Sequence, residues 1–129
     1  MRKILRFAAL VAACSGVAAS AWGQETFPNR PIQVVLPLQA GSASDIAVRL
    51  VAERLAEILG QGLVVENVAG AGGLIGANRL ATARADGYTL AALNNSILTI
   101  LPHMQRGQVK FDSFSDFIPL RGLANIPTY

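Results

Sequence analysis

Two glycine-rich segments contain the residues of this chain that are best suited to chemistry. The first, Pro37-Leu38-Gln39-Ala40-Gly41-Ser42-Ala43-Ser44-Asp45, follows an apolar run and precedes an amphipathic pattern. The second, Gly70-Ala71-Gly72-Gly73-Leu74-Ile75-Gly76, has the same setting. A loop that opens a helix presents backbone N–H groups at the positive end of the helix dipole, and such loops attract anions. The two loops therefore predict a pocket for a carboxylate or a phosphate.

The first loop allows two interpretations of the same residues. As a ligand loop, it would hold a carboxylate with its backbone N–H groups and the hydroxyls of Ser42 and Ser44, at the carboxyl end of a strand, where open α/β sheets bind ligands. As a plain helix start, Ser42 or Ser44 would cap the helix and Asp45 would balance its dipole. The ligand-binding candidates in this loop are Ala40, Gly41, Ser42, Ser44 and Asp45.

The second loop has the spacing Gly-x-Gly-x-x-x-Gly, which is close to the fingerprint of a dinucleotide-binding turn. Ile75 stands where that fingerprint requires glycine, and no acidic residue ends the next strand to hold a ribose. The competing interpretation is that the glycines let this loop and its helix pack closely against neighbouring backbone. Gly72 remains a ligand-binding candidate, together with Asn95 and Ser96, which follow the third strand and either bond a ligand or turn the chain.

No arrangement of residues typical of catalysis accompanies these loops. His103 is the only histidine and has no cysteine or cluster of acids near it in the sequence, so it predicts neither a metal site nor a nucleophilic pair. Ser42 and Ser44 have no base at a recognisable spacing. We therefore expect a protein that is not an enzyme and that uses no cofactor and no metal.

The elements that must position the loops alternate between strands and helices. A continuous apolar run over residues 32–36 predicts a strand buried on both faces. The next helix runs from about Asp45 to Leu59 and is ended by Gly60 and Gly62. Glu53 and Glu57 are expected on its exposed side. Its predicted inward face consists of Ile46, Ala47, Leu50, Val51, Leu55, Ile58 and Leu59.

The same alternation continues along the chain and predicts an α/β fold with a parallel sheet and right-handed crossovers. In such a sheet both loops and the segment 94–96 lie at one edge. The further expected elements are a strand over 63–66, a helix over 74–85 with Ile75 and Leu80 inward, a strand over 88–93, a short helix over 96–101 stopped by Pro102, and a strand over 118–124.

The N-terminal residues 1–23 have the pattern of a cleaved secretory signal peptide. Arg2, Lys3 and Arg6 precede an apolar stretch of small residues, and small residues allow cleavage after Gly23 or, as a second choice, after Ala21. A membrane anchor is one alternative. Another is a lipoprotein anchor, since Val11-Ala12-Ala13-Cys14 resembles a lipoprotein processing box. Export argues against a nucleotide cofactor, because these cofactors belong mostly to the cytoplasm.

The charge of the chain excludes one class of partner. The formal charge is +3, but three of the eleven bases lie within residues 1–23 and all eight acids follow them. The remainder is therefore neutral and has no basic stripe for nucleic acid. The sequence ends shortly after the apolar run 118–123, which favours an N-terminal piece of a larger protein.

An ordered set of motifs now resembles a known family. The motifs are Phe27-Pro28-Asn29-Arg30-Pro31-Ile32, Pro37 through Asp45, Val64-Val65-Glu66-Asn67, Gly70-Ala71-Gly72-Gly73, Ile75-Gly76, Asp86-Gly87-Tyr88-Thr89-Leu90, Val109-Lys110-Phe111-Asp112 and Asp116-Phe117-Ile118-Pro119-Leu120. Together they resemble the substrate-binding proteins of tripartite tricarboxylate transporters, the Bug family of periplasmic receptors.

This resemblance implies the first lobe of a type 2 periplasmic-binding-protein fold, which closes with a second lobe on a small organic carboxylate. It implies delivery to the membrane permease subunits of the transporter, a monomer when full length, and a carboxylate held by backbone and water-mediated bonds from the first loop. Residues 1–23 would be the signal peptide and 24–129 an incomplete first lobe. Ser42-Ala43 and Val68-Ala69 depart from the family pattern. The alternatives are half of an NAD(P)-dependent enzyme or a nonfunctional fragment.

Overall fold

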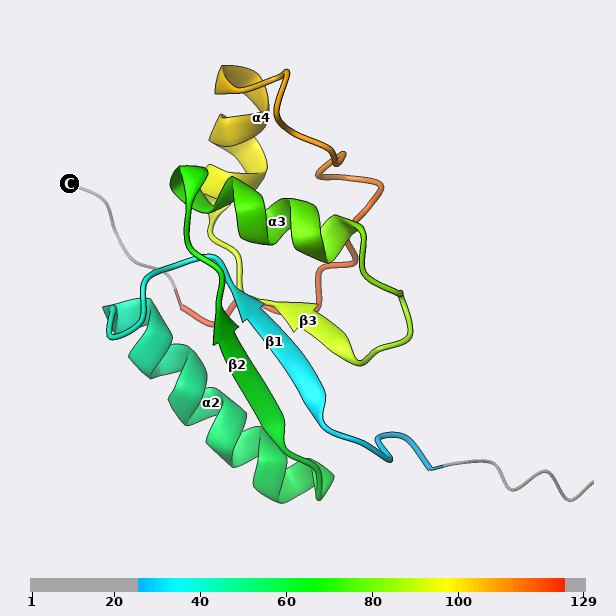
Figure 1. The fold of residues 1–129 in the computed structure, drawn as a ribbon. Coiled ribbons are helices and arrows are strands. Elements are labelled where there is room, and N and C mark those ends of the chain that lie inside the picture. Colours follow the sequence, from blue (N-terminus) through cyan, green and yellow to red (C-terminus); the bar gives the residue numbers. More distant parts are fainter. Residues whose placement is uncertain (1–25, 125–129) are drawn as a thin grey trace, which may run out of the picture.

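Three parallel strands form the sheet of this protein, whose computed structural model describes residues 26–124 (Figure 1). The strands are β1 (Ile32–Leu36), β2 (Leu63–Asn67) and β3 (Thr89–Ala91), in the order β2-β1-β3. Leu36 pairs with Asn67 at the carboxyl end, so β1 and β2 end level with each other. The predicted parallel sheet is confirmed, although β3 is shorter than the predicted 88–93.

The central strand β1 carries the core of the lobe because it is covered on both faces. Val35 and Leu36 are 0% and 1% exposed. On one face, Val34 and Leu36 cluster with Val48 of the helix α2 (Ala43–Leu59). On the other, α3 (Leu74–Ala81) lies across the sheet, preceded by the short 3₁₀ helix η1 (Ala71–Gly73).

The helix α2 buries a different face from the predicted one. Its buried residues are Asp45, Val48 and Ala52, whereas Ile46, Leu50 and Ile58 are 55%, 63% and 69% exposed. The rest of the predicted inward face, namely Ala47, Val51, Leu55 and Leu59, is exposed as well. The hydrogen bonds of Asp45 explain the difference, because they require its side chain to point into the lobe and thereby set the rotation of the helix.

The boundaries of both long helices follow local chemistry. Ser42 caps α2 by accepting the N–H of Asp45, which places the start of the helix before the predicted Asp45. Gly60 ends α2 in the left-handed conformation, with φ +67°, as predicted. The helix α3 ends at Ala81 and not at 85, and Ile75, predicted inward, is 53% exposed.

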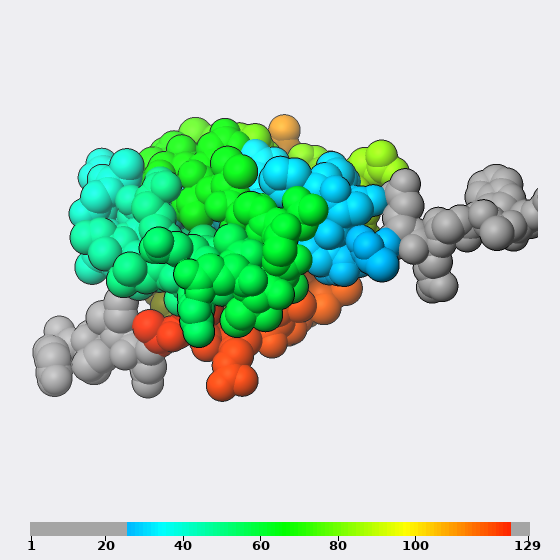
Figure 2. Space-filling view, turned by 90° about the horizontal axis from the view of Figure 1, so that it is seen from below, coloured from blue at the N-terminus to red at the C-terminus, as the bar shows by residue number. Residues whose placement is uncertain are grey.

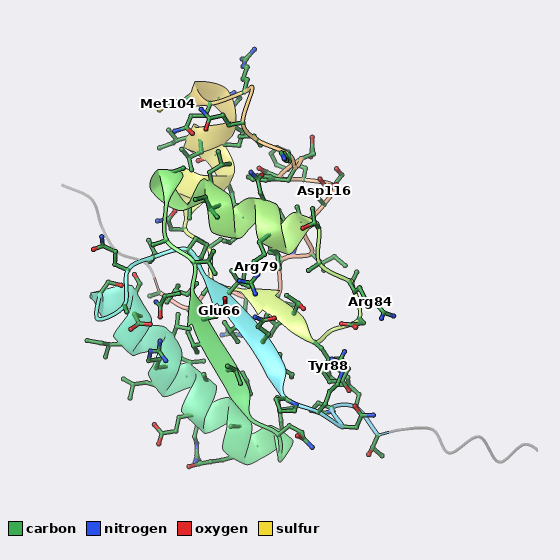
Figure 3. All side chains as sticks on the ribbon, in the orientation of Figure 1. Glu66, Arg79, Arg84, Tyr88, Met104 and Asp116 are labelled. Atoms are coloured by element: carbon green, nitrogen blue, oxygen red, sulfur yellow. The ribbon has the colours of Figure 1, made fainter. Side chains whose placement is uncertain are left out.

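An ion pair fastens α3 to the sheet. Both guanidinium nitrogens of Arg79 donate to the carboxylate of Glu66 on β2, at 2.5 and 2.8 Å, and Figure 3 shows the two side chains pointing toward each other. Gln33 of β1 donates to the same carboxylate. These donors lower the pKa of Glu66, with the hydrogen bond from Arg79 as the largest cause.

The segment after β3 departs most from the sequence-based prediction. A π-helical turn, η2 (Ser96–Ile100), runs directly into α4 (Leu101–Met104). Pro102 does not stop this helix. It lies in the first turn of α4, a position at which helices tolerate proline.

The predicted strand over 118–124 is also wrong. These residues pair with none of the three strands, and an apolar run without a pairing neighbour does not form a strand. Ile118 and Leu120 are 84% and 75% exposed. In Figure 2 this segment forms an orange-to-red band along one side of the molecule.

A cluster at the amino edge of the sheet fixes the first described residues to the turn before β3. The ring of Phe27 packs edge-on against Tyr88, with ring centroids 5.0 Å apart. The guanidinium of Arg30 lies 3.9 Å from the centroid of the Tyr88 ring and forms a 3.0 Å ion pair with Asp86. The hydroxyl of Tyr88 donates to the Asn29 side chain. We call these residues the amino-edge cluster.

No helix within residues 26–124 is long and apolar enough to span a membrane.

Candidate functional site

The three loops that follow the strands meet at the carboxyl edge of the sheet (Figure 1). The loop after β1 contains the candidates from Ala40 to Asp45, the loop after β2 contains Gly72, and Asn95 and Ser96 follow β3. An ideal Cβ on Gly73 would lie 3.4 Å from Pro37 and 2.5 Å from Ile97, so parts of all three loops touch. The predicted convergence of these segments is therefore present.

The first loop contains backbone N–H groups that have no acceptor within residues 26–124. Gly41 has a φ of +78°, a conformation that favours glycine, and a Cβ added there would meet nothing within 4 Å. Ser42 donates its N–H to the Gln39 carbonyl at 3.3 Å. In the described part of the chain, the N–H groups of Ala40, Ala43 and Ser44 meet no acceptor. The N–H groups of Ala43 and Ser44 lie in the first turn of α2, at the positive end of its dipole, and that of Ala40 lies in the loop before it.

Asp45 is the buried charge of this edge, with 4% of its surface exposed. Its Oδ2 accepts the N–H of Gly41 at 2.8 Å, and its Oδ1 accepts Nε of Arg49 at 2.9 Å and Nδ2 of Asn67 at 3.0 Å. The Gly41 hydrogen bond, followed by those from Arg49 and Asn67, lowers the pKa of Asp45 to about 2. Asp45 is thus an ionised acceptor with both oxygens in use inside the protein.

Asn67 is a residue of this edge that the sequence-based prediction missed. From the end of β2, its Nδ2 also donates to the Leu38 carbonyl at 3.1 Å, and its Oδ1 accepts from Arg49 at 2.7 Å. It therefore ties the first loop to the second strand. The available signal was an amide side chain at the carboxyl end of a strand, next to the predicted edge.

The glycines of the second loop serve close packing. A Cβ on Gly76 would lie 2.8 Å from Cγ of Pro37 and 3.0 Å from the Val68 carbonyl oxygen. A Cβ on Gly73 would lie closer still, 2.5 Å from Cδ1 of Ile97. A Cβ on Gly72, whose φ is +67°, would lie 3.5 Å from Leu101. Close packing thus accounts for Gly73 and Gly76 without a nucleotide, whereas the contact at Gly72 is of ordinary length and its positive φ is what favours glycine there.

The residues after β3 divide into a capping residue and exposed ones. Asn94 accepts the N–H of Ile97 at 3.0 Å through its side chain. Asn95 and Ser96 are exposed, and their side chains form no hydrogen bond within residues 26–124. His103 is exposed on α4, and the described residues contain no group of three histidine, cysteine or acidic side chains that could hold a metal.

A shallow hollow of about 290 Å³ lies elsewhere, on the flank between α2 and β2. Arg49, Glu53 and Leu63 are among its lining residues, and none of the sequence-predicted ligand-binding residues lines it.

Comparison with known proteins identifies the group to which this chain belongs. The profile of TctC, the tripartite tricarboxylate transporter family receptor, matches residues 47–129. The chain belongs to this family. A UPF0065 protein of Bordetella bronchiseptica is 38% identical over 127 residues, which cover 98% of this chain and 37% of that protein. BugT of Bordetella pertussis is 33% identical over 127 residues, covering 98% of this chain and 39% of BugT. The chain spans less than two fifths of the length of these TctC relatives.

Solved structures of TctC-type proteins share the fold. MatC of Rhodopseudomonas palustris with bound malate is 33% identical, with a TM-score of 0.67, and the match covers 72% of this chain and 31% of MatC. A TctC solute-binding protein from Polaromonas is 34% identical, with a TM-score of 0.60, over 67% of this chain and 29% of that protein. The predicted family and the predicted α/β part of a periplasmic binding protein are confirmed. TctC receptors are periplasmic solute-binding proteins.

Proposed function

We propose that this chain is the first, carboxylate-binding lobe of a periplasmic receptor that serves a tripartite tricarboxylate-type transporter. The observation that carries this proposal is that, in the first loop and the first turn of α2, the N–H groups of Ala40, Ala43 and Ser44 have no acceptor within residues 26–124. Such groups are suited to the oxygens of a carboxylate. The malate bound to MatC, a structural neighbour, supports the same ligand class.

The local charge is compatible with an anion beside the loop. Arg49 forms an ion pair with the buried Asp45, so the carboxylate of Asp45 is compensated inside the protein. The Oγ of Ser42 accepts the N–H of Asp45, which leaves its hydroxyl hydrogen to serve as a further donor. Asn95 and Ser96 offer exposed polar groups across the edge.

The receptor would not alter its ligand. It would pass the carboxylate to the membrane permease of the transporter, after closing a second lobe over it. One lobe covers one side of a ligand only, so this chain should bind weakly. Two or three charge-assisted hydrogen bonds barely exceed the cost of association, so we expect a dissociation constant of about 1 mM or weaker.

Binding of malate, followed by NMR titration of the full chain, tests this function. We expect saturable shifts of the amides of residues 40–44 with malate, and none with sodium chloride at the same ionic strength. NADH serves as the competing ligand. Micromolar binding of NADH without any response to malate would contradict the receptor function and would indicate a nucleotide-binding protein.

Export forms a separate part of the proposal, since residues 1–23 lie outside the described part of the chain. We propose that they are a signal peptide cleaved after Gly23. N-terminal sequencing of the protein recovered from the cell envelope should begin at Gln24, or at Trp22 if cleavage follows Ala21. A lipid-modified Cys14 at the N-terminus would contradict cleavage after Gly23 and would indicate a lipid-anchored protein. An intact Met1 in the cytosol would contradict export.

A further inference from the structure

Asp45 lies too deep, and is too fully bonded, to act on a ligand directly. Both of its carboxylate oxygens accept hydrogen bonds from the protein, and only 4% of the residue is exposed. A carboxylate also has no hydrogen to donate to an anionic ligand. Its place at the edge therefore needs another explanation than ligand contact.

The hydrogen bond from Gly41 fixes the orientation of one peptide group of the loop. The Ala40–Gly41 peptide is trans, so its N–H and its carbonyl point to opposite sides. Because the N–H of Gly41 points inward to Asp45, the carbonyl of Ala40 points outward from the loop. No donor within residues 26–124 reaches this carbonyl.

The carboxylate that orients this peptide is itself held from two other elements. Arg49, one turn further along α2, and Asn67, at the end of β2, both donate to Oδ1. Arg49 is the charged group that faces Asp45, and it also donates to Asn67. Asn67 holds the Leu38 carbonyl at the beginning of the loop. The loop is thus fixed at Leu38 and at Gly41 by one connected set of side chains.

We propose that Asp45, held by Asn67 and Arg49, is a positioning residue that keeps the Ala40–Gly41 peptide with its N–H inward and its carbonyl outward. The proposal rests on the proposed function and names a feature of the ligand. An outward carbonyl beside backbone donors fits a carboxylate that carries a neighbouring hydroxyl or ammonium group, which can donate to the Ala40 oxygen.

The variant Asp45→Asn tests the positioning role because the three donors compete for one remaining oxygen. Arg49 and Asn67 supply two of them on the Oδ1 side, so the amide oxygen should face them. The new amide NH₂ would then face the N–H of Gly41, and this contact between two donors should turn the peptide over. Asp116→Asn is the matched control, since Asp116 accepts the N–H of Asp112, four residues earlier, at 2.8 Å, away from the edge (Figure 3).

The first readout is the ratio of malate to succinate affinity in the full chain, since succinate lacks only the hydroxyl. One hydrogen bond to the Ala40 oxygen should favour malate by about five-fold. Asp45→Asn should bring the ratio close to one, and Asp116→Asn should leave it unchanged. A ratio in Asp45→Asn equal to that of the unmodified protein would overturn the proposal.

The second readout requires no ligand, and it does not depend on whether the Asp45→Asn variant folds. In the full chain with Arg49→Gln, the pKa of Asp45 should rise, because one of the donors that lower it is weakened. The amide proton of Gly41 and the carboxyl carbon of Asp45 should then titrate with the same midpoint. If the chemical shift of the Gly41 amide proton does not change with this midpoint, the positioning role is rejected. An unmodified protein that binds neither malate nor succinate, while Gly41 still follows Asp45, rejects the proposed function instead.

Discussion

The substitution Gly41→Val separates a ligand-binding loop from a plain helix start. Gly41 has a φ of +78°, and a side chain there has open space around its Cβ. The folded lobe should therefore lose only the cost of the left-handed backbone, about 1–2 kcal/mol, with no clash added. For a domain of this size, that corresponds to a decrease in melting temperature of roughly 4–16 °C.

Malate binding by the folded variant should weaken as well, for a reason separate from the loss of stability. The valine methyl groups would occupy the exposed space beside the N–H groups of Ala40 and Ala43, where we place the carboxylate. We expect at least a ten-fold weaker response to malate, equivalent to about 1.4 kcal/mol. Circular dichroism measures the melting temperature, and NMR titration measures the affinity.

The control is Gly107→Val, at a glycine that also has nothing within 4 Å of its Cβ but has no positive φ. This variant should change neither quantity. If Gly41→Val binds malate like the unmodified protein, the loop only starts the helix and our site is misplaced.

Three further perturbations test the surrounding structure. Ser42→Ala removes the cap of α2 and should cost about 1 kcal/mol in a denaturant titration, with only a modest effect on malate binding because the main donors are backbone groups. Gly76→Ala forces a Cβ to within 3.0 Å of both Pro37 and the Val68 carbonyl and should cost about 1–3 kcal/mol of unfolding free energy. Folding lowers the pKa of Asp45 from 3.8 to about 2, so its stabilisation is complete above pH 3.8 and disappears as the pH falls through 2. Melting temperatures at about pH 5 and about pH 2.5 should differ less in Asp45→Asn than in the unmodified protein.

The fold could be predicted from the sequence where an element that is buried on both faces appears as a continuous run of apolar residues. The run over 32–36 is apolar because β1 is covered on both faces, and its bounds are the predicted ones. The face of α2 could not be predicted in this way, because the helix carries apolar residues around most of its circumference. Its rotation follows from Asp45, a charge whose burial depends on Asn67, 22 positions later in the chain.

The candidate site likewise contains residues that could be predicted from the sequence and residues that could not. Gly41 could be identified from the sequence because a left-handed backbone conformation favours glycine. Its positive φ agrees with that reasoning. The glycines of the second loop left two interpretations open, since a close neighbour and a ligand both exclude a side chain. Only the distances from Gly73 and Gly76 to Ile97 and Pro37 favour packing. Asn67 was missed because its partners lie in two distant segments.

The amino-edge cluster has a practical consequence for measuring these interactions. Phe27 and Arg30 are fastened to Tyr88, at the opposite edge of the sheet from the loops that we expect to bind the ligand (Figure 3). A sensor surface coupled to the lobe at this corner would leave the carboxyl edge facing the solution. The immobilised protein should therefore report ligand binding with the same affinity as the free one.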